Sequence, residues 1–210
     1  MHYTLYYKRK LPHYQPRDAT FFITLRLDFN IPQQYLLALN RYRETLQINY
    51  ADSEEHAQTK EIIKKKSFAY EDELYHKCTG EIDVSRNPCA NILKTKLLAM
   101  QDEFFYLYAF TIMPNHLHIL LKPLVREGEQ VSLSTIIKSF KGSTARLINM
   151  ELKRERSLWY REYFDHWVRN QQELVNVIEY IRNNPVKAGL VKDAREWKET
   201  WLNPDLWQEQ

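Results

Sequence analysis

The stretch 108–123 constrains the fold of this chain more than any other segment. Two apolar runs flank Pro114 and Asn115, residue types that favour tight turns, which predicts an antiparallel pair of strands. Successive side chains of a strand point to opposite faces, so His116 and His118 share one face and the neighbouring leucine and isoleucine side chains share the other. The two imidazoles then lie about 7 Å apart at their backbones, close enough to bind one divalent ion. The alternative is a pair of half-exposed histidines on a surface-facing strand.

Length and composition restrict the class of protein. A chain of 210 residues fits one domain with a proper core. The net charge of +3 permits a nucleic-acid partner without requiring one. The four glycines are far apart, which excludes a glycine-rich phosphate-binding loop. The two cysteines lack metal-site spacing, and no segment resembles a signal peptide or a membrane span, so we expect free thiols and a cytoplasmic protein.

Hydrophobic spacing predicts the remaining elements. Strands are expected at 20–27, 104–113 and 164–168, and helices from Pro32, over 90–100, after Ser132 or Ser134, and after Asn170, where Glu173 completes a capping box. In the first strand the buried face holds Phe21, Ile23, Leu25 and Leu27, and the other face holds Phe22, Thr24 and Arg26. The inward stripe of the helix after Ser132 consists of Ile136, Ile137, Phe140, Thr144 and Leu147. The charged segment 51–66 is typical of a solvated helix face or a mobile insertion.

Basic side chains in two places are candidate contacts to a nucleic-acid backbone, because cations supply most non-specific affinity for phosphates. The first group precedes any periodic segment and consists of Lys8, Arg9 and Lys10, with tyrosines nearby for base stacking. The second lies outside the apolar stripe of the helix after Ser132 and consists of Lys138, Lys141 and Arg146. A solvated tail and a solvated lysine face are the competing interpretations.

A second constellation lies on the helix that follows Asn170. Tyr180 falls beside its apolar stripe, and Asn184 follows one turn later on the same flank. Pro185 disfavours helical geometry at Asn184, so we expect the helix to end there and to display the amide at its edge.

Two histidines, a tyrosine and an amide together indicate metal-assisted phosphoryl transfer. A divalent ion bound by His116, His118 and Asn184 would polarise a phosphodiester. Tyr180 would attack phosphorus and form a covalent phosphotyrosine, although a free phenol with a pKa near 10 is a weak nucleophile without such help. Because a phenolate also leaves readily, this chemistry suits strand transfer better than digestion.

The motifs at 113–118 and 180–190 resemble those of the REP-associated tyrosine transposases, a branch of the single-tyrosine HUH endonucleases, whose name stands for His-hydrophobic-His. Weaker similarity lies at 9–14, 137–140 and 163–170. The resemblance covers most of the chain except about 45–90. The tail at 194–201 departs from the family's aromatic C-terminal motif, so target recognition by that segment is not implied.

The resemblance implies an α+β class, with a ferredoxin-like antiparallel sheet and packed helices in one domain over 1–210, and a helical insertion at about 45–90. It also implies Mg²⁺ or Mn²⁺ and cleavage of single-stranded DNA at hairpin, REP-like elements through a 5′-phosphotyrosine intermediate. Tyr180 matches the nucleophile, His116 and His118 the metal ligands, and Asn184 the third ligand. Arg182, in the same motif, joins the DNA-binding candidates, and the role of His166 stays open.

The expected protein is a transposase of the bacterial cytoplasm, associated with the nucleoid, with no membrane partner and either monomeric or homodimeric. Two other hypotheses stay open at this point. One is a domesticated relative that binds DNA without cutting it. The other is a metal-dependent phosphodiesterase of small substrates in which Tyr180 is dispensable.

Overall fold

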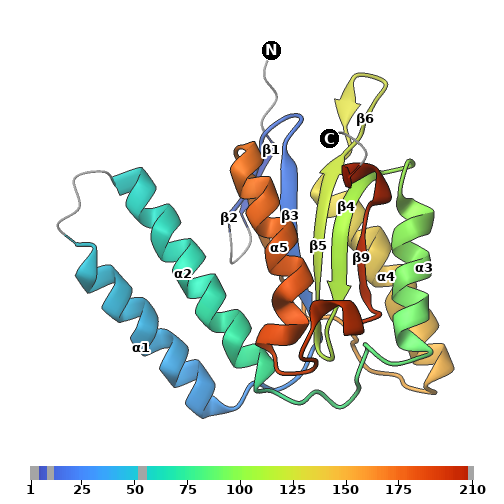
Figure 1. The fold of residues 1–210 in the computed structure, drawn as a ribbon, viewed down its shortest axis with the longest axis horizontal. Coiled ribbons are helices and arrows are strands. Elements are labelled where there is room, and N and C mark those ends of the chain that lie inside the picture. The colour runs from blue at the N-terminus through green and yellow to red at the C-terminus, as the bar shows by residue number, and fades with distance from the viewer. Residues whose placement is uncertain (1–4, 9–11, 52–55, 208–210) are drawn as a thin grey trace. The chain divides into compact units, whose positions relative to one another are not determined.

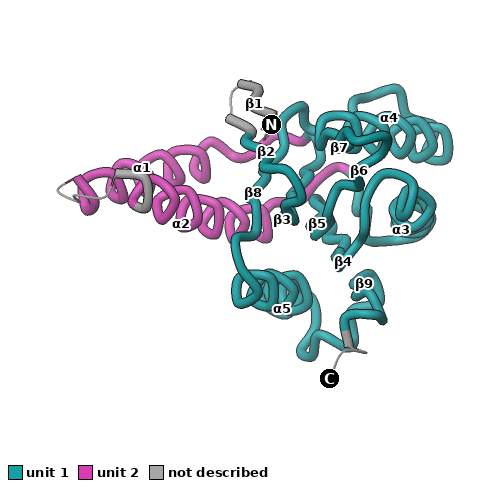
Figure 2. Tube along the Cα trace, turned by 90° about the horizontal axis from the view of Figure 1, so that it is seen from above, with its two compact units in different colours: residues 1–28, 82–210 teal, residues 29–81 magenta. Residues whose placement is uncertain are grey.

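The computed structural model describes residues 5–8, 12–51 and 56–207. It divides into two compact units, of which unit 1 comprises residues 1–28 and 82–210 and unit 2 comprises residues 29–81 (Figure 2). Each unit is described separately below. Within the described residues, no helix is both long and apolar enough to cross a membrane.

Unit 1 is built around one antiparallel sheet of five strands (Figure 1). In spatial order these are β8 (Phe164–Val168), β3 (Thr20–Arg26), β5 (His116–Pro123), β4 (Phe105–Ile112) and β9 (Thr200–Leu202). Among the described residues of this unit, the α-helices are α3 (Cys89–Met100), α4 (Leu133–Glu151) and α5 (Gln171–Lys187). Four neighbouring strands of this sheet, in the spatial order β8-β3-β5-β4, have the order of a ferredoxin-like fold. As in that fold, α3 follows β3 in the chain and α4 follows β5. The predicted α+β class is confirmed.

The two faces of the sheet are covered by different helices, with α3 and α4 on one side and α5 on the other (Figures 1 and 2). Alternate side chains such as Phe21, Ile23 and Ile119 are almost completely buried on the α3–α4 side. The inward stripe of α4 differs from the prediction at one position, because Leu147 is 39% exposed and Ile148 is fully buried. Ser132 caps α4 by accepting a hydrogen bond from the Thr135 amide at 3.1 Å.

Helix α5 begins as predicted but ends later. The Asn170 side chain accepts the Glu173 amide hydrogen bond at 2.8 Å, and the Glu173 carboxylate accepts that of Arg169 at 2.8 Å. The prediction that the helix ends at Asn184 is wrong, because Pro185 lies inside it and one more turn continues to Lys187. Because proline has no N–H, Pro185 cannot donate a hydrogen bond to the preceding turn of the helix. The following turn is unaffected, and the Ala188 amide donates to the Asn184 carbonyl at 2.9 Å. Asn184 is consequently buried and not displayed at a helix edge.

Strand β9 was not predicted from the sequence. It pairs with β4, and the ring of Trp201 stacks on Phe110 with centroids 5.7 Å apart. The Trp197 indole donates a hydrogen bond to the Ile112 carbonyl at 3.1 Å. Strand β9 therefore forms one edge of the five-stranded sheet.

The smaller elements of unit 1 are β1 (Leu5–Lys8), β2 (Pro12–Gln15), β6 (Val125–Arg126), β7 (Glu129–Gln130) and the 3₁₀ turns η1 (Ala194–Glu196) and η2 (Pro204–Trp207). The expected basic arm falls partly in β1, which pairs with β2. Lys8 ends β1, whereas Arg9 and Lys10 lie outside the described residues.

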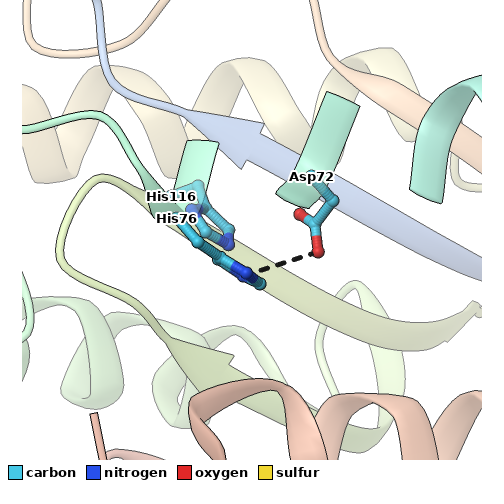
Figure 3. Close-up of side chains that lie close together, drawn as sticks. All are labelled: Asp72, His76 and His116. Carbon is cyan, nitrogen blue, oxygen red and sulfur yellow. Dashed lines mark ion pairs between the residues drawn. The ribbon is translucent and has the colours of Figure 1, made fainter. Parts of the chain in front are cut away.

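Unit 2 is a pair of helices, α1 (Gln33–Asn49) and α2 (His56–His76). The rings of Tyr42 and Tyr70 stack across the pair with centroids 4.4 Å apart. On α2, Asp72 and His76 form an ion pair at 3.7 Å, one helical turn apart (Figure 3). The single-domain organisation with an insertion at about 45–90 stays a prediction.

Candidate functional site

The hairpin of β4 and β5 positions the two histidines. The turn closes with a hydrogen bond from the Met113 amide to the His116 carbonyl at 2.9 Å. His116 and His118 lie on the same face, with ring centroids 4.7 Å apart and no exposed area. Their complete burial excludes the alternative of half-exposed surface histidines, and buried imidazoles need polar partners.

One ring nitrogen of each histidine is engaged by a neighbouring side chain. His116 Nδ1 donates to Asn115 Oδ1 at 2.6 Å, because an amide oxygen can only accept. His118 Nδ1 lies 2.8 Å from the Thr24 hydroxyl, which stands directly opposite on β3. When both Nδ1 atoms donate, both lone pairs are on Nε2, and this is the arrangement of histidines that bind metals with a supporting hydrogen bond behind them.

Tyr180 on α5 lies against the same face of the sheet. Its ring centroid is 5.6 Å from that of His118 and 5.7 Å from that of Phe22, and both contacts are edge-on. Phe22 in turn stacks on His118 at 5.4 Å. The tyrosine keeps partial exposure, so its ring meets the histidine face on one side and remains accessible. The structure thus brings together three of the four residues singled out on the strand and the helix.

Asn184, the fourth of these residues, follows Tyr180 by one turn of α5 and has no exposed area. A buried amide needs polar partners, as the buried imidazoles do. Two imidazole nitrogens and an amide oxygen form a donor set that fits Mg²⁺ or Mn²⁺ when water or phosphate oxygens complete the coordination.

The basic candidates are spread over several places. Lys138 and Arg146 are exposed on α4, on the side of the sheet away from the histidines (Figure 1). Lys141 instead donates to the Tyr160 carbonyl at 2.8 Å and the Glu162 carbonyl at 3.3 Å, which ties α4 to the following loop. Arg182 is the candidate on α5, where it pairs with Glu179 at 3.1 Å. The three candidates on α4 therefore lie on the opposite side of the sheet from α5, which carries Tyr180.

His166 joins strand β8 to the start of α5. Its Nε2 lies 2.9 Å from the Glu173 carboxylate, which also takes part in the helix cap. This contact positions the helix that carries Tyr180, and gives His166 a structural role in the described part of the chain.

Four residues near the site were not identified as site residues from the sequence, and one of them is Asn115, which was predicted only as a turn residue. Phe22 and Thr24 were assigned to the correct face of β3, but the register that sets Thr24 opposite His118 depends on strand pairing. Lys187 lies in the last turn of α5 with its ammonium 4.6 Å from the centre of the Tyr180 ring. A spacing of seven residues on one helix was the available signal for that contact.

Comparison with known proteins finds similarity to one family of transposases. The family described as "transposase IS200 like" matches residues 83–184. A REP-associated tyrosine transposase of Escherichia coli is 24% identical over 115 residues, which are 55% of this chain and 62% of that protein. A Haemophilus influenzae protein provisionally named as such a transposase is 26% identical over 108 residues, or 49% of this chain and 61% of that protein. Over about half of its length, the chain is thus similar to REP-associated tyrosine transposases.

The fold is also similar to that of a protein of known structure. A solved structure of a REP-associated tyrosine transposase bound to a REP hairpin superposes with a TM-score of 0.50, and the match covers 92% of this chain and 82% of that one at 17% identity. The resemblance inferred from the motifs is therefore confirmed. The chain aligns with about three fifths of the length of its curated relatives among the REP-associated tyrosine transposases.

Proposed function

We propose that the protein is a metal-dependent endonuclease and strand transferase of single-stranded DNA, with Tyr180 as its nucleophile. The observation that carries the proposal is the contact between the Tyr180 ring and His118, whose neighbour on the same face is His116. A tyrosine beside a pair of buried imidazoles is suited to phosphodiester chemistry.

His116 and His118 would hold the ion through Nε2 and Asn184 would hold it through its amide oxygen. Bound there, Mg²⁺ or Mn²⁺ would withdraw charge from the scissile phosphodiester. Thr24 and Asn115 keep the two imidazoles in orientation through their Nδ1 atoms.

Tyr180 then attacks phosphorus with its phenol oxygen. The phenol gives up its proton to water as the new bond joins its oxygen to phosphorus. The bond from phosphorus to the 3′ oxygen breaks, and the released 3′ oxygen takes up a proton from water to become a 3′ hydroxyl. The product is a 5′-phosphotyrosine, which preserves the energy of the phosphodiester for rejoining. Attack by another 3′ hydroxyl restores the phenol and completes strand transfer.

The proposed substrate is single-stranded DNA that carries hairpin, REP-like elements. Support comes from the relative that was solved with a REP hairpin bound. We further propose that one chain suffices for cutting, because Tyr180 contacts the histidine face of its own chain. Chromosomal DNA as substrate would place the protein in the bacterial cytoplasm, at the nucleoid.

A substitution of the nucleophile tests the proposal. With a panel of labelled single-stranded hairpins and Mn²⁺, the wild-type chain should cut and form a covalent adduct that is visible on a denaturing gel. Tyr180→Phe should bind the same hairpins and cut none, because it lacks the attacking oxygen. Tyr70→Phe, which removes a phenol hydroxyl from unit 2, should cut normally. Full cutting by Tyr180→Phe would refute the assigned nucleophile, and binding without cutting by the wild type would favour a DNA-binding protein.

A further inference from the structure

The ring of Tyr180 is bordered by a cation as well as by the sheet. Phe22 and His118 approach it from the sheet, and the ammonium of Lys187 lies 4.6 Å from its centre. Lys187 is exposed, whereas Tyr180 is partly buried. A positive charge at the solvent boundary therefore adjoins the proposed nucleophile.

The position of Lys187 near the end of α5 does not by itself explain this contact. Cations are favoured in the last turn of a helix because they oppose the helix dipole, and an extended side chain in water would serve that purpose. The Lys187 side chain instead runs back toward the helix N-terminus, over the preceding two turns, to reach the Tyr180 ring. Attraction between ammonium and aromatic ring holds it there.

Lys187 and Arg182, two cations of α5, differ in whether a carboxylate compensates their charge. Arg182 pairs with Glu179 at 3.1 Å, which compensates part of its charge. In the part of the chain that the structure describes, no carboxylate lies within ion-pair distance of Lys187. An uncompensated ammonium with three donors on a flexible stem is suited to bind a phosphate oxygen.

We propose that Lys187 binds a non-bridging oxygen of the scissile phosphodiester and positions its phosphorus for attack by Tyr180. This inference rests on the proposed function and adds a phosphate-binding residue to it. Negative charge spreads over the phosphoryl oxygens during transfer, and a cation placed beside the nucleophile interacts with that charge. The same contact orients the DNA backbone over the Tyr180 ring.

A lysine-reactivity footprint tests the contact without requiring cutting. The full chain with Tyr180→Phe is treated with an amine acetylating reagent, alone and with a saturating single-stranded hairpin that has single-stranded flanks. Mass spectrometry then gives the extent of modification at each lysine. Lys187 should be protected by the DNA, and Lys96, which lies on α3 on the far side of the sheet, should react equally in both samples. Unchanged reactivity of Lys187 in a saturated complex would overturn the inference.

Rate measurements with variants test the positioning role. Lys187→Met keeps the length of the side chain and removes its charge, so its single-turnover cutting rate should fall on the order of 100-fold. Lys187→Arg should recover most of the rate, because it restores a cation. The affinity for Mn²⁺ should stay close to that of the wild type in both variants, whereas the affinity for hairpin DNA should fall in Lys187→Met, which loses a phosphate contact, and be retained in Lys187→Arg. The positioning role would be overturned if Lys187→Met cut at the wild-type rate, or if the cutting rate fell equally in Lys187→Met and Lys187→Arg.

The two experiments separate this inference from the proposed function. A wild-type chain that cuts, with Lys187 unprotected, would leave the nucleophile assignment intact and remove Lys187 from the site. A chain that never cuts, with Lys187 protected, would refute the proposed activity and retain a DNA phosphate contact at Lys187. Absence of both cutting and protection would refute both.

Discussion

At the scale of a single residue, the hydroxyl of Thr24 is the described contact of the His118 Nδ1 atom. It is almost fully buried and lies 2.8 Å from His118 Nδ1, so it fixes the direction of the imidazole plane. Residues that stand behind a metal-binding histidine in this way influence how tightly the metal is held.

We predict that Thr24→Val weakens Mn²⁺ binding by about tenfold or more, since loss of such a partner typically costs 10–100-fold. Valine has nearly the shape of threonine and lacks the hydroxyl. Thr24→Ser is the matched control, and it should bind nearly as the wild type because the hydroxyl is retained. Electron paramagnetic resonance of free Mn²⁺ measures the affinity. Equal affinity in Thr24→Val would mean that the hydroxyl does not support a ligand.

At this scale, the sequence predicted the residues that belong to continuous motifs and missed those that meet through pairing. Alternation along one strand was enough to put His116 and His118 on one face. The partner of His118, Thr24, lies 94 residues away and becomes a neighbour only through strand register. The packing of Phe22 and Lys187 on Tyr180 likewise depends on where α5 lies over the sheet.

At the scale of an element, helix α5 likewise has one end that a local pattern predicted and one end that depends on tertiary packing. Its start was predicted because a capping box is a local pattern, and Asn170 and Glu173 form the expected bonds. Its end was not, because tertiary packing buries Asn184 and Pro185 and outweighs the local preference against a helical residue before proline. Strand β9 escaped prediction because three residues with partial exposure carry too little periodicity.

We predict that Asn170→Ala lowers the free energy of unfolding by about 1 kcal/mol, because the Glu173 amide at the start of α5 loses its acceptor. Urea denaturation followed by circular dichroism measures the change. Asn170→Asp, which keeps the acceptor oxygen, should remain close to the wild type. An unchanged midpoint in Asn170→Ala would show that the cap contributes nothing to this helix.

The distribution of charge distinguishes the two units at the scale of the whole molecule. Unit 2 has seven basic and nine acidic side chains, whereas the rest of the chain has 23 basic and 18 acidic ones. The net charge of unit 1 is therefore +5 and that of unit 2 is −2. All strands of the five-stranded sheet and all four proposed site residues belong to unit 1.

We predict that replacing residues 29–81 with a short glycine–serine linker preserves binding of hairpin DNA and its salt dependence, since the excess of cations lies in unit 1. Fluorescence anisotropy of a labelled hairpin across a salt series gives both quantities. Thermal unfolding confirms that the shortened chain is folded. Loss of DNA affinity in a folded variant would instead assign DNA binding to unit 2.

The most direct measurement of the central claim is the identity of the amino acid that becomes linked to DNA. The wild-type chain is incubated with a cleavable single-stranded hairpin and Mn²⁺, digested with nuclease and trypsin, and analysed by tandem mass spectrometry. The account predicts a nucleotide on the tryptic peptide 170–182, in which Tyr180 is the only tyrosine. A nucleotide on any other peptide, or cleavage of the hairpin with no covalent adduct, would contradict it.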